Sequence, residues 1–287
     1  MNEFISALMG YNENYNAELL ERAYRRAELQ HRGQKRRSGE DYIIHPKAVA
    51  IILANLGMDD KSIAAGLLHD VVEDTEYSLA DCRKEFGPEI AMLVDGVTKL
   101  TSLVYESRED RQAENIRKMF LAMSKDIRIL IIKLSDRLHN MRTIEFQSPE
   151  KRIEKCRETL DIYAPLAARL GIYAFKFEME DISFKNLYPE EYSELDAQMQ
   201  ARKSKRAEIV EDVIAQLNDA LGGLGIKYEI YGRNKHYYSI YKKMQFQEKG
   251  IDEIFDLNAV RVIVESVKDC YGVLGTVHTM WTPIPGR

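Results

Sequence analysis

Two ionisable side chains, His69 and Asp70, stand next to each other in an otherwise mostly apolar stretch, residues 62–74. The pattern of this stretch predicts a helix, and adjacent ionisable groups in such a helix are costly to bury unless something pairs with them. Imidazole and carboxylate together suit a borderline divalent cation such as Mn²⁺, Fe²⁺ or Zn²⁺, and the lack of a nearby cysteine disfavours structural zinc. These residues therefore indicate a cation site, with Mn²⁺ expected first.

Two more carboxylates follow these residues at helical spacing. Glu73 comes one turn after His69 and Asp74 one turn after Asp70, so we expect all four side chains on neighbouring stripes of one helix. Glu73 and Asp74 could simply end the helix in water, but acidic groups at a helix C-terminus oppose the helix dipole. That conflict favours a functional role beside a metal.

A second acidic position lies in the predicted helix 129–144. Asp136 stands there among apolar residues, with Asn140 and Thr143 at the +4 and +7 positions of its face. This helix could therefore offer one metal ligand and two hydrogen-bonding groups.

Each of these residues also has a plainer interpretation. Asp136 could pair with Lys133 or Arg137 at the surface, and His139 could be a solvated histidine. His45, which precedes a proline, could merely close a turn. Residue types and spacing alone therefore support a metal-assisted hydrolase without excluding an ordinary helical surface.

The elements that would position these residues change in kind along the chain. Apolar residues recur at intervals of three and four from Tyr15 to about Gln216, which predicts a mainly α protein whose helical domain covers residues 1–187. Residues 188–220 are highly charged and almost free of helix breakers, as expected of a connecting helix. The runs 226–231 and 257–264 are β-branched or aromatic and predict an α/β module with a mixed sheet over residues 221–287, which we expect to be incomplete.

Composition limits the classes of function. The chain has 287 residues, 45% hydrophobic and 30% charged, as expected of a globular protein with two domains. Its net charge of −5 gives no overall attraction to nucleic acid or an acidic membrane. No apolar run approaches the roughly 20 residues of a membrane span, and the three cysteines form no CxxC pair. We expect a cytoplasmic protein without a membrane or direct nucleic-acid partner.

Four segments together resemble the hydrolase domain of long RelA/SpoT-type alarmone enzymes: residues 31–34, 38–46, 68–75 and 133–143. The resemblance implies an all-α HD-type domain that removes the 3′-pyrophosphate of ppGpp or pppGpp in the stringent response, releasing GDP or GTP. It implies one Mn²⁺ held by four ligands: His45, His69, Asp70 and Asp136. It also assigns Glu73 and Asp74 as catalytic carboxylates that orient or deprotonate water.

A polyanionic substrate needs basic groups, and the run 35–37 could supply them. Without the resemblance this run is more simply a solvated charge run. The resemblance assigns nucleotide contacts to five residues: Arg36, Arg37, Ser38, Asn140 and Thr143. Two positions depart from the family pattern, Arg37 where lysine is usual and Asp41 where proline is common. Relatives that only synthesise the alarmone have degraded hydrolase motifs, so the intact set here implies an active hydrolase.

Residues 232–244, 256–261 and 270–275 resemble the start of the alarmone synthetase domain. The resemblance implies that Arg233, Lys235 and Lys243 meet ATP phosphates and that Asp256 binds Mg²⁺. The resemblance breaks off at residue 287, so we expect no synthetase activity from this chain and a role for Mg²⁺ only in a complete domain. The family's ribosome contact belongs to a C-terminal region that this sequence lacks.

Two other functions remain open from the sequence. The first is an HD phosphohydrolase that acts on another nucleotide. The second is a catalytically silent module that binds nucleotides for regulation. A substrate panel distinguishes the first from an alarmone hydrolase, and metal analysis of the purified protein tests the second.

Overall fold

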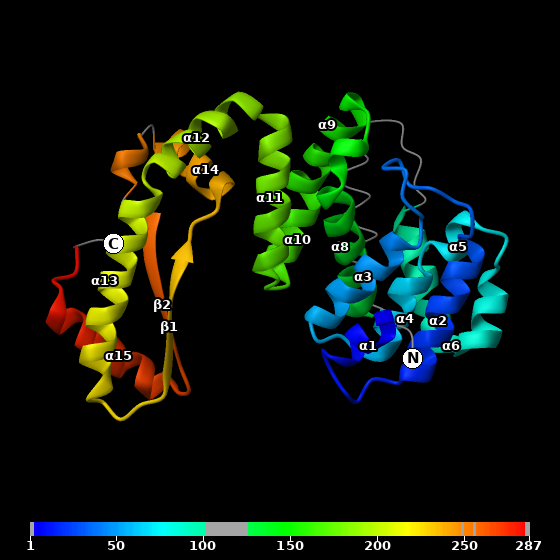
Figure 1. The fold of residues 1–287 in the computed structure, drawn as a ribbon, viewed down its shortest axis with the longest axis horizontal. Coiled ribbons are helices and arrows are strands. Elements are labelled where there is room, and N and C mark those ends of the chain that lie inside the picture. The colour runs from blue at the N-terminus through cyan, green and yellow to red at the C-terminus, as the bar shows by residue number, and fades with distance from the viewer. Residues whose placement is uncertain (1–2, 102–125, 248–249, 255–256, 285–287) are drawn as a thin grey trace. The chain divides into compact units, whose positions relative to one another are not determined.

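A computed structural model describes residues 3–101, 126–247, 250–254 and 257–284 of the chain. The chain divides into two compact units, residues 1–187 and 188–287. The first unit is helical, and the second adds a two-stranded antiparallel sheet (Figure 1). The predicted fold class, mainly α with a small α/β module, is confirmed. Within the described ranges, no helix combines the length and the apolar character needed to cross a membrane.

The first unit consists of helices joined by short loops. Several ends carry the expected caps: the Ser148 side chain accepts from the amide of Lys151, and Pro149 occupies the first turn. The helices are α1 (Glu3–Met9), α2 (Ala17–Gln30), α3 (Ile44–Asn55), α4 (Asp60–Leu68), α5 (Val71–Asp74), α6 (Leu79–Thr101), α8 (Ile127–Arg142), η1 (Ile144–Phe146), α9 (Pro149–Glu158), η2 (Thr159–Tyr163), α10 (Ala164–Arg169) and α11 (Tyr173–Leu187).

Helix α8 separates two hydrophobic cores of this unit. Ile129 and Ile132 belong to the core formed mainly by α1 to α6, whereas Leu134 and Leu138 belong to the core formed with α9 to α11. A helix that packs on both sides is buried around most of its circumference, and polar side chains on it need partners. The ionisable groups of α8 are therefore informative about function.

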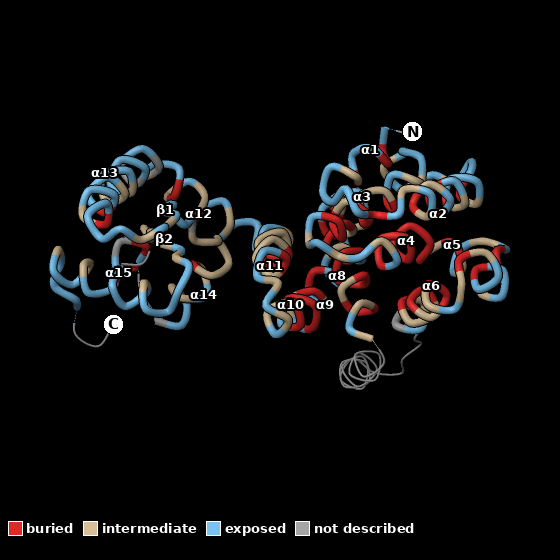
Figure 2. The backbone as a smooth tube through the Cα atoms, turned by 90° about the horizontal axis from the view of Figure 1, so that it is seen from below, coloured by how far each residue is buried: buried red, intermediate tan, exposed pale blue. Residues whose placement is uncertain are grey.

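Helices α3 and α4 pack closely, and the start of α3 lies near the end of α4. Gly66 of α4 faces Leu53 of α3, and a methyl group at Gly66 would lie 2.5 Å from Leu53 Cδ1. Both helices are largely buried, and α4 is red along most of its length in Figure 2. Glycine thus permits the spacing at which α3 and α4 present His45 and His69.

The prediction of one continuous helix over residues 62–74 is wrong. Helix α4 ends at Leu68, α5 begins at Val71, and His69 and Asp70 lie between them. The Nδ1 atom of His69 lies 2.8 Å from the carbonyl oxygen of Gly66, which in an unbroken helix would accept from the amide of Asp70. A side-chain donor therefore competes with the backbone at the break.

Arg128, in the first turn of α8, ties together the starts of two helices. Its guanidinium lies 2.7 Å from Asp126, which caps α8, and 2.8 Å from Asp59, which caps α4. It also lies 2.9 Å from Glu89 of α6. One cation thus links α4 and α8, the helices that lead to His69 and Asp136.

We expect Arg128→Met to lower the free energy of unfolding by about 1–2 kcal/mol, because several partly exposed pairs, each worth up to about 1 kcal/mol, are lost together. Urea unfolding followed by circular dichroism measures the change. Lys61→Met is the matched control, since Lys61 pairs with Glu89 at the exposed surface, and we expect no measurable effect. Equal stability of Arg128→Met and the wild type would contradict the linking role.

In the second unit, residues 188–220, predicted as one connecting helix, form two helices with different packing partners. Leu195 and Met199 are buried in the first helix, which lies against α14 (Tyr237–Gln247). Leu217 and Leu221 are buried in the second helix, which lies against the sheet. The first helix ends at Ala201, and Arg202 separates it from the second helix. The elements are α12 (Pro189–Ala201), α13 (Lys203–Gly222), β1 (Tyr228–Asn234), α14 (Tyr237–Gln247), η3 (Ile251–Glu253), β2 (Asn258–Val264) and α15 (Val267–Met280).

Candidate metal centre

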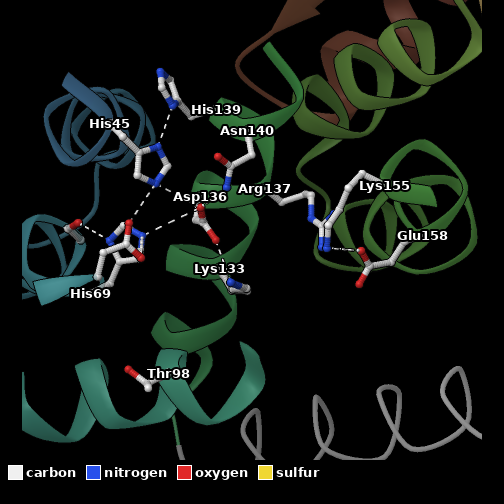
Figure 3. A network of polar contacts seen from close by, with 12 residues as sticks. His45, His69, Thr98, Lys133, Asp136, Arg137, His139, Asn140, Lys155 and Glu158 are labelled. Carbon is white, nitrogen blue, oxygen red and sulfur yellow. Dashed lines mark hydrogen bonds and ion pairs between the residues drawn. The ribbon is translucent and has the colours of Figure 1, made fainter. Parts of the chain in front are cut away.

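Four of the predicted site residues converge in the first unit. His45 comes from the first turn of α3, His69 and Asp70 from the break after α4, and Asp136 from α8. The ligand atoms of His45, His69 and Asp70 all lie within 4.8 Å of one another. Asp136 Oδ1 lies 3.2 Å from His45 Nε2 and 3.9 Å from His69 Nε2. Figure 3 shows the two imidazoles and the Asp136 carboxylate turned toward each other.

The chemistry of this cluster fits a bound divalent cation. His69 Nε2 is buried and has no hydrogen-bond partner among the described residues, although Asp70 Oδ1 lies 3.1 Å away. His69 Nδ1 lies 2.8 Å from the Gly66 carbonyl, so Nδ1 carries the hydrogen and Nε2 keeps a lone pair. Two buried imidazoles beside two carboxylates form a ligand set suited to Mn²⁺, Fe²⁺ or Zn²⁺.

Asp136 is held ionised inside the protein. Burial opposes its ionisation, but the adjacent charge of Lys133 outweighs this effect and keeps the pKa of the carboxyl well below its ordinary value. Lys133 Nζ lies 2.7 Å from Asp136 Oδ2, and Asn140 Nδ2 lies 2.5 Å from Asp136 Oδ1. The alternative of an Asp136–Lys133 pair at the surface is wrong, since both residues are buried.

Tyr42 is a site residue that we did not predict. Its hydroxyl lies 2.8 Å from Asp70 Oδ2 and 3.1 Å from Asp74 Oδ2, so its one hydrogen is shared between these two carboxylates. The ring of Tyr42 stacks on His31 with centroids 4.5 Å apart. Tyr42 thus joins a candidate metal ligand to a candidate catalytic carboxylate. It lies in a loop before α3, where no helical period marks one face, so only its closeness to His45 in sequence was a signal.

The two carboxylates of α5, Glu73 and Asp74, lie at the exposed edge of the cluster. Partial burial raises the pKa of Glu73, Lys133 opposes that effect, and the charge of Asp70 adds to it. Asp74 is tied to Asp70 through Tyr42. The structure therefore places an accessible carboxylate pair beside the cation site, although α5 is separate from α4.

The basic loop folds back on itself as a short hairpin. Lys35 pairs with Asp41 across it, and Gly39 turns the chain with a φ of +87°. Arg36 is half-buried, and its Nη2 atom lies 3.1 Å from Asn140 Oδ1 and 3.3 Å from Thr143 Oγ1. Three of the five predicted nucleotide contacts, on the loop and on α8, are therefore neighbours.

The other two predicted contacts lie on the outer part of this loop. Arg37 is exposed and has no ion pair with the part of the chain that the structure describes. Ser38 is half-buried, and its hydroxyl donates to Glu40 at 3.0 Å. Among the described residues, neither forms a hydrogen bond or ion pair with α8, and their roles in nucleotide binding stay predictions.

His139 is buried, and the alternative of a solvated histidine is wrong. Its Nδ1 atom lies 2.7 Å from His45 Nδ1, on the side of His45 opposite the cluster (Figure 3). Burial, with the neighbouring charge of Arg36, lowers the pKa of His139 to about 3, so its ring is neutral at pH 7. The signal was available in the sequence, because His139 follows Asp136 by three residues on one face of a helix.

The residues predicted for a synthetase site lie in the second unit. Arg233 is exposed in β1, Lys235 lies in the loop after it, and Lys243 is in α14. Asp256 lies outside the described residues. The roles of these four residues in a synthetase site stay predictions.

Each of the two units contains a region that matches a known protein family. Residues 23–173 match the HD domain family, and residues 232–287 match the region found in RelA and SpoT proteins. A GTP pyrophosphokinase of Streptomyces coelicolor is 53% identical over 268 residues, which cover 93% of this chain and 31% of that protein. A probable guanosine-3′,5′-bis(diphosphate) 3′-pyrophosphohydrolase of Synechocystis is 51% identical over 258 residues, 90% of this chain and 34% of that protein.

A third relative carries both activities in its name. The bifunctional (p)ppGpp synthase/hydrolase SpoT of Escherichia coli is 46% identical over 268 residues, which cover 93% of this chain and 38% of that protein. The chain therefore spans about a third of the length of the curated relatives it matches.

Proposed function

Because the chain belongs to the HD domain family and joins that domain to the region found in RelA and SpoT proteins, we propose that its first unit is a (p)ppGpp 3′-pyrophosphohydrolase. The single observation that carries the proposal is the cluster of His45, His69, Asp70 and Asp136, with the lone pair of His69 Nε2 buried and unpartnered. The names of relatives that are 46–51% identical support the choice of substrate.

In the proposed reaction, different residues of the site have different roles. His45, His69, Asp70 and Asp136 would hold the cation, for which Mn²⁺ is our first choice. Its chemistry when bound is that of a Lewis acid, which lowers the pKa of water and withdraws charge from a phosphoryl group. Outside these ligands, the Tyr42 hydroxyl lies between Asp70 and Asp74 and orients them through its one shared hydrogen.

The proposed step is hydrolysis at the phosphorus next to the 3′ oxygen. The water oxygen forms a bond to that phosphorus as the bond from phosphorus to the 3′ oxygen breaks. The 3′ oxygen leaves with the electron pair of that bond and takes a proton from solvent, which gives GDP and pyrophosphate. Glu73 or Asp74 accepts the proton of the water, and the raised pKa of Glu73 brings this carboxylate closer to the working pH of a general base. Arg36, Asn140 and Thr143, which contact one another, would bind the nucleotide.

A direct assay tests the proposal. We expect the 287-residue chain with ppGpp and Mn²⁺ to release pyrophosphate and GDP in equal amounts, and a chelator to stop the reaction. Preference for another nucleotide in a panel would replace alarmone hydrolysis with a different phosphohydrolase activity. Purified protein that neither contains nor responds to a divalent cation would support the silent regulatory module instead.

Synthesis is a separate question for this chain. We propose that residues 1–287 do not transfer pyrophosphate from ATP to GDP. Measurement of AMP formation in the presence of Mg²⁺ tests this directly, and AMP formed in proportion to ppGpp would contradict it.

A further inference from the structure

Arg36 makes three polar contacts with one stretch of α8. Its Nη1 atom lies 3.4 Å from His139 Nδ1, and Nη2 lies near Asn140 Oδ1 and Thr143 Oγ1. The side chain reaches α8 from the hairpin loop, more than a hundred residues earlier in the chain. The same guanidinium that we propose for nucleotide binding is thus already engaged with the protein.

The first contact decides how His45 is protonated. A guanidinium presents only hydrogens and positive charge, so Arg36 Nη1, 3.4 Å away, disfavours a hydrogen on His139 Nδ1 and leaves the single lone pair of that nitrogen as an acceptor. His45 Nδ1 lies 2.7 Å from the same nitrogen and must therefore carry the hydrogen. His45 Nε2 then keeps its lone pair, 3.2 Å from Asp136 Oδ1 and 3.4 Å from Asp70 Oδ2. This is the tautomer that a metal ligand needs.

The second contact decides how Asn140 is turned. Its oxygen faces Arg36, so its amide nitrogen points the other way and donates to Asp136 Oδ1 at 2.5 Å. Arg36 therefore reaches two of the four candidate ligands, His45 through His139 and Asp136 through Asn140. Its neighbour Arg37 is exposed and reaches neither route.

We propose that Arg36 is a positioning residue for the metal centre, and that the chain's affinity for a divalent cation depends on Arg36 even when no nucleotide is present. The inference rests on the proposed function only in taking these four residues as the cation site. It gives one side chain of the nucleotide loop a second task, in which it fixes the donors and acceptors around His45 and Asp136.

The direction in which cation affinity changes distinguishes a positioning role of Arg36 from an effect of its charge alone. Removal of a cationic side chain near a cation site reduces repulsion and, by charge alone, tightens cation binding. Loss of a group that orients metal ligands through hydrogen bonds weakens binding, typically 10–100-fold. Arg36→Met and Arg37→Met remove the same charge from adjacent positions, and only the first removes the contacts with α8.

The experiment titrates the full chain with Mn²⁺ alone and follows the free ion by electron paramagnetic resonance. We expect Arg36→Met to bind Mn²⁺ about 10–100-fold more weakly than the wild type, and Arg37→Met to bind it equally or slightly more tightly. Wild-type or tighter affinity of Arg36→Met would overturn the proposal. Because no nucleotide is present, this result is independent of whether ppGpp is the substrate.

A pair of variants at His139 tests the route to His45 and covers the case in which Arg36→Met fails to fold. Asparagine can still present an acceptor to His45 Nδ1, whereas leucine cannot. We expect His139→Asn to keep Mn²⁺ affinity within a few-fold of the wild type and His139→Leu to lose about 10–100-fold, with unchanged circular dichroism in both. Full affinity of His139→Leu would also overturn the proposal.

Discussion

Replacement of Asp70 by asparagine is expected to slow the release of pyrophosphate from ppGpp by more than about 100-fold. Replacement of groups that only hydrogen-bond a metal ligand costs 10–100-fold, so removal of a ligand's charge should cost more. The fold should persist, because Asp70 is partly exposed and an amide oxygen can still accept from Tyr42. Initial rates at several Mn²⁺ concentrations, with circular dichroism as the check of folding, measure the effect.

Asp95→Asn is the matched control for this substitution. Asp95 lies in α6 and pairs with Lys99 one turn away at the exposed surface, so the same chemical change there should leave the hydrolysis rate unchanged. A folded Asp70→Asn variant that hydrolyses ppGpp at the wild-type rate would show that the cluster is not the reaction centre.

Much of the fold follows from local patterns in the sequence. Helix α8 could be predicted because its apolar residues recur at helical intervals, and the strands because their residues are β-branched or aromatic. The break between α4 and α5 could not, because the contact of His69 Nδ1 with the Gly66 carbonyl at this break leaves no mark in residue spacing. Periodicity describes which face of a helix is apolar and contains no term for a side chain that competes with the backbone.

In the candidate site, too, some residues could be predicted from the sequence and others could not. Asp136 and Asn140 lie one turn apart on one helix, so their spacing was enough to group them. His139 carried the same signal, but its spacing did not exclude a solvated histidine. The contacts of Tyr42 with Asp70 and of Arg36 with Asn140 join segments that only the packing of the helices brings together. Sequence spacing therefore predicted which helix faces matter, while the loop residues that orient the ligands required the three-dimensional structure.

The substitution Glu158→Gln is expected to lower the free energy of unfolding of the first unit by about 3 kcal/mol at pH 7. Arg137, adjacent to Asp136 but on the other side of α8 (Figure 3), is buried with its guanidinium 2.8 Å from Glu158. Loss of one partner of a buried pair typically costs 3–5 kcal/mol, and the lower end applies because the Glu158 side chain is 25% exposed. Tyr163, whose ring centre lies 4.0 Å from the guanidinium, cannot replace the lost charge.

The effect should depend on pH in a defined direction. Burial opposes ionisation of Glu158, but Arg137 and Lys155 outweigh it and lower its pKa below the ordinary value of 4.5. The stability that this carboxylate contributes is therefore complete above pH 4.5 and is lost as the pH falls through the lowered pKa. Wild type and Glu158→Gln should differ most at pH 7 and converge in stronger acid.

Urea unfolding of the full chain at several pH values tests both statements. The single tryptophan, Trp281, lies in the second unit, so its fluorescence serves as an internal reference while circular dichroism follows the helices. Glu178→Gln is the control, because Glu178 pairs with Arg142 at the exposed surface and should contribute less than about 1 kcal/mol. A difference that stays constant from pH 7 into strong acid would mean that Glu158 acts through packing and not through its charge, since protonation of the wild-type carboxyl would then change nothing.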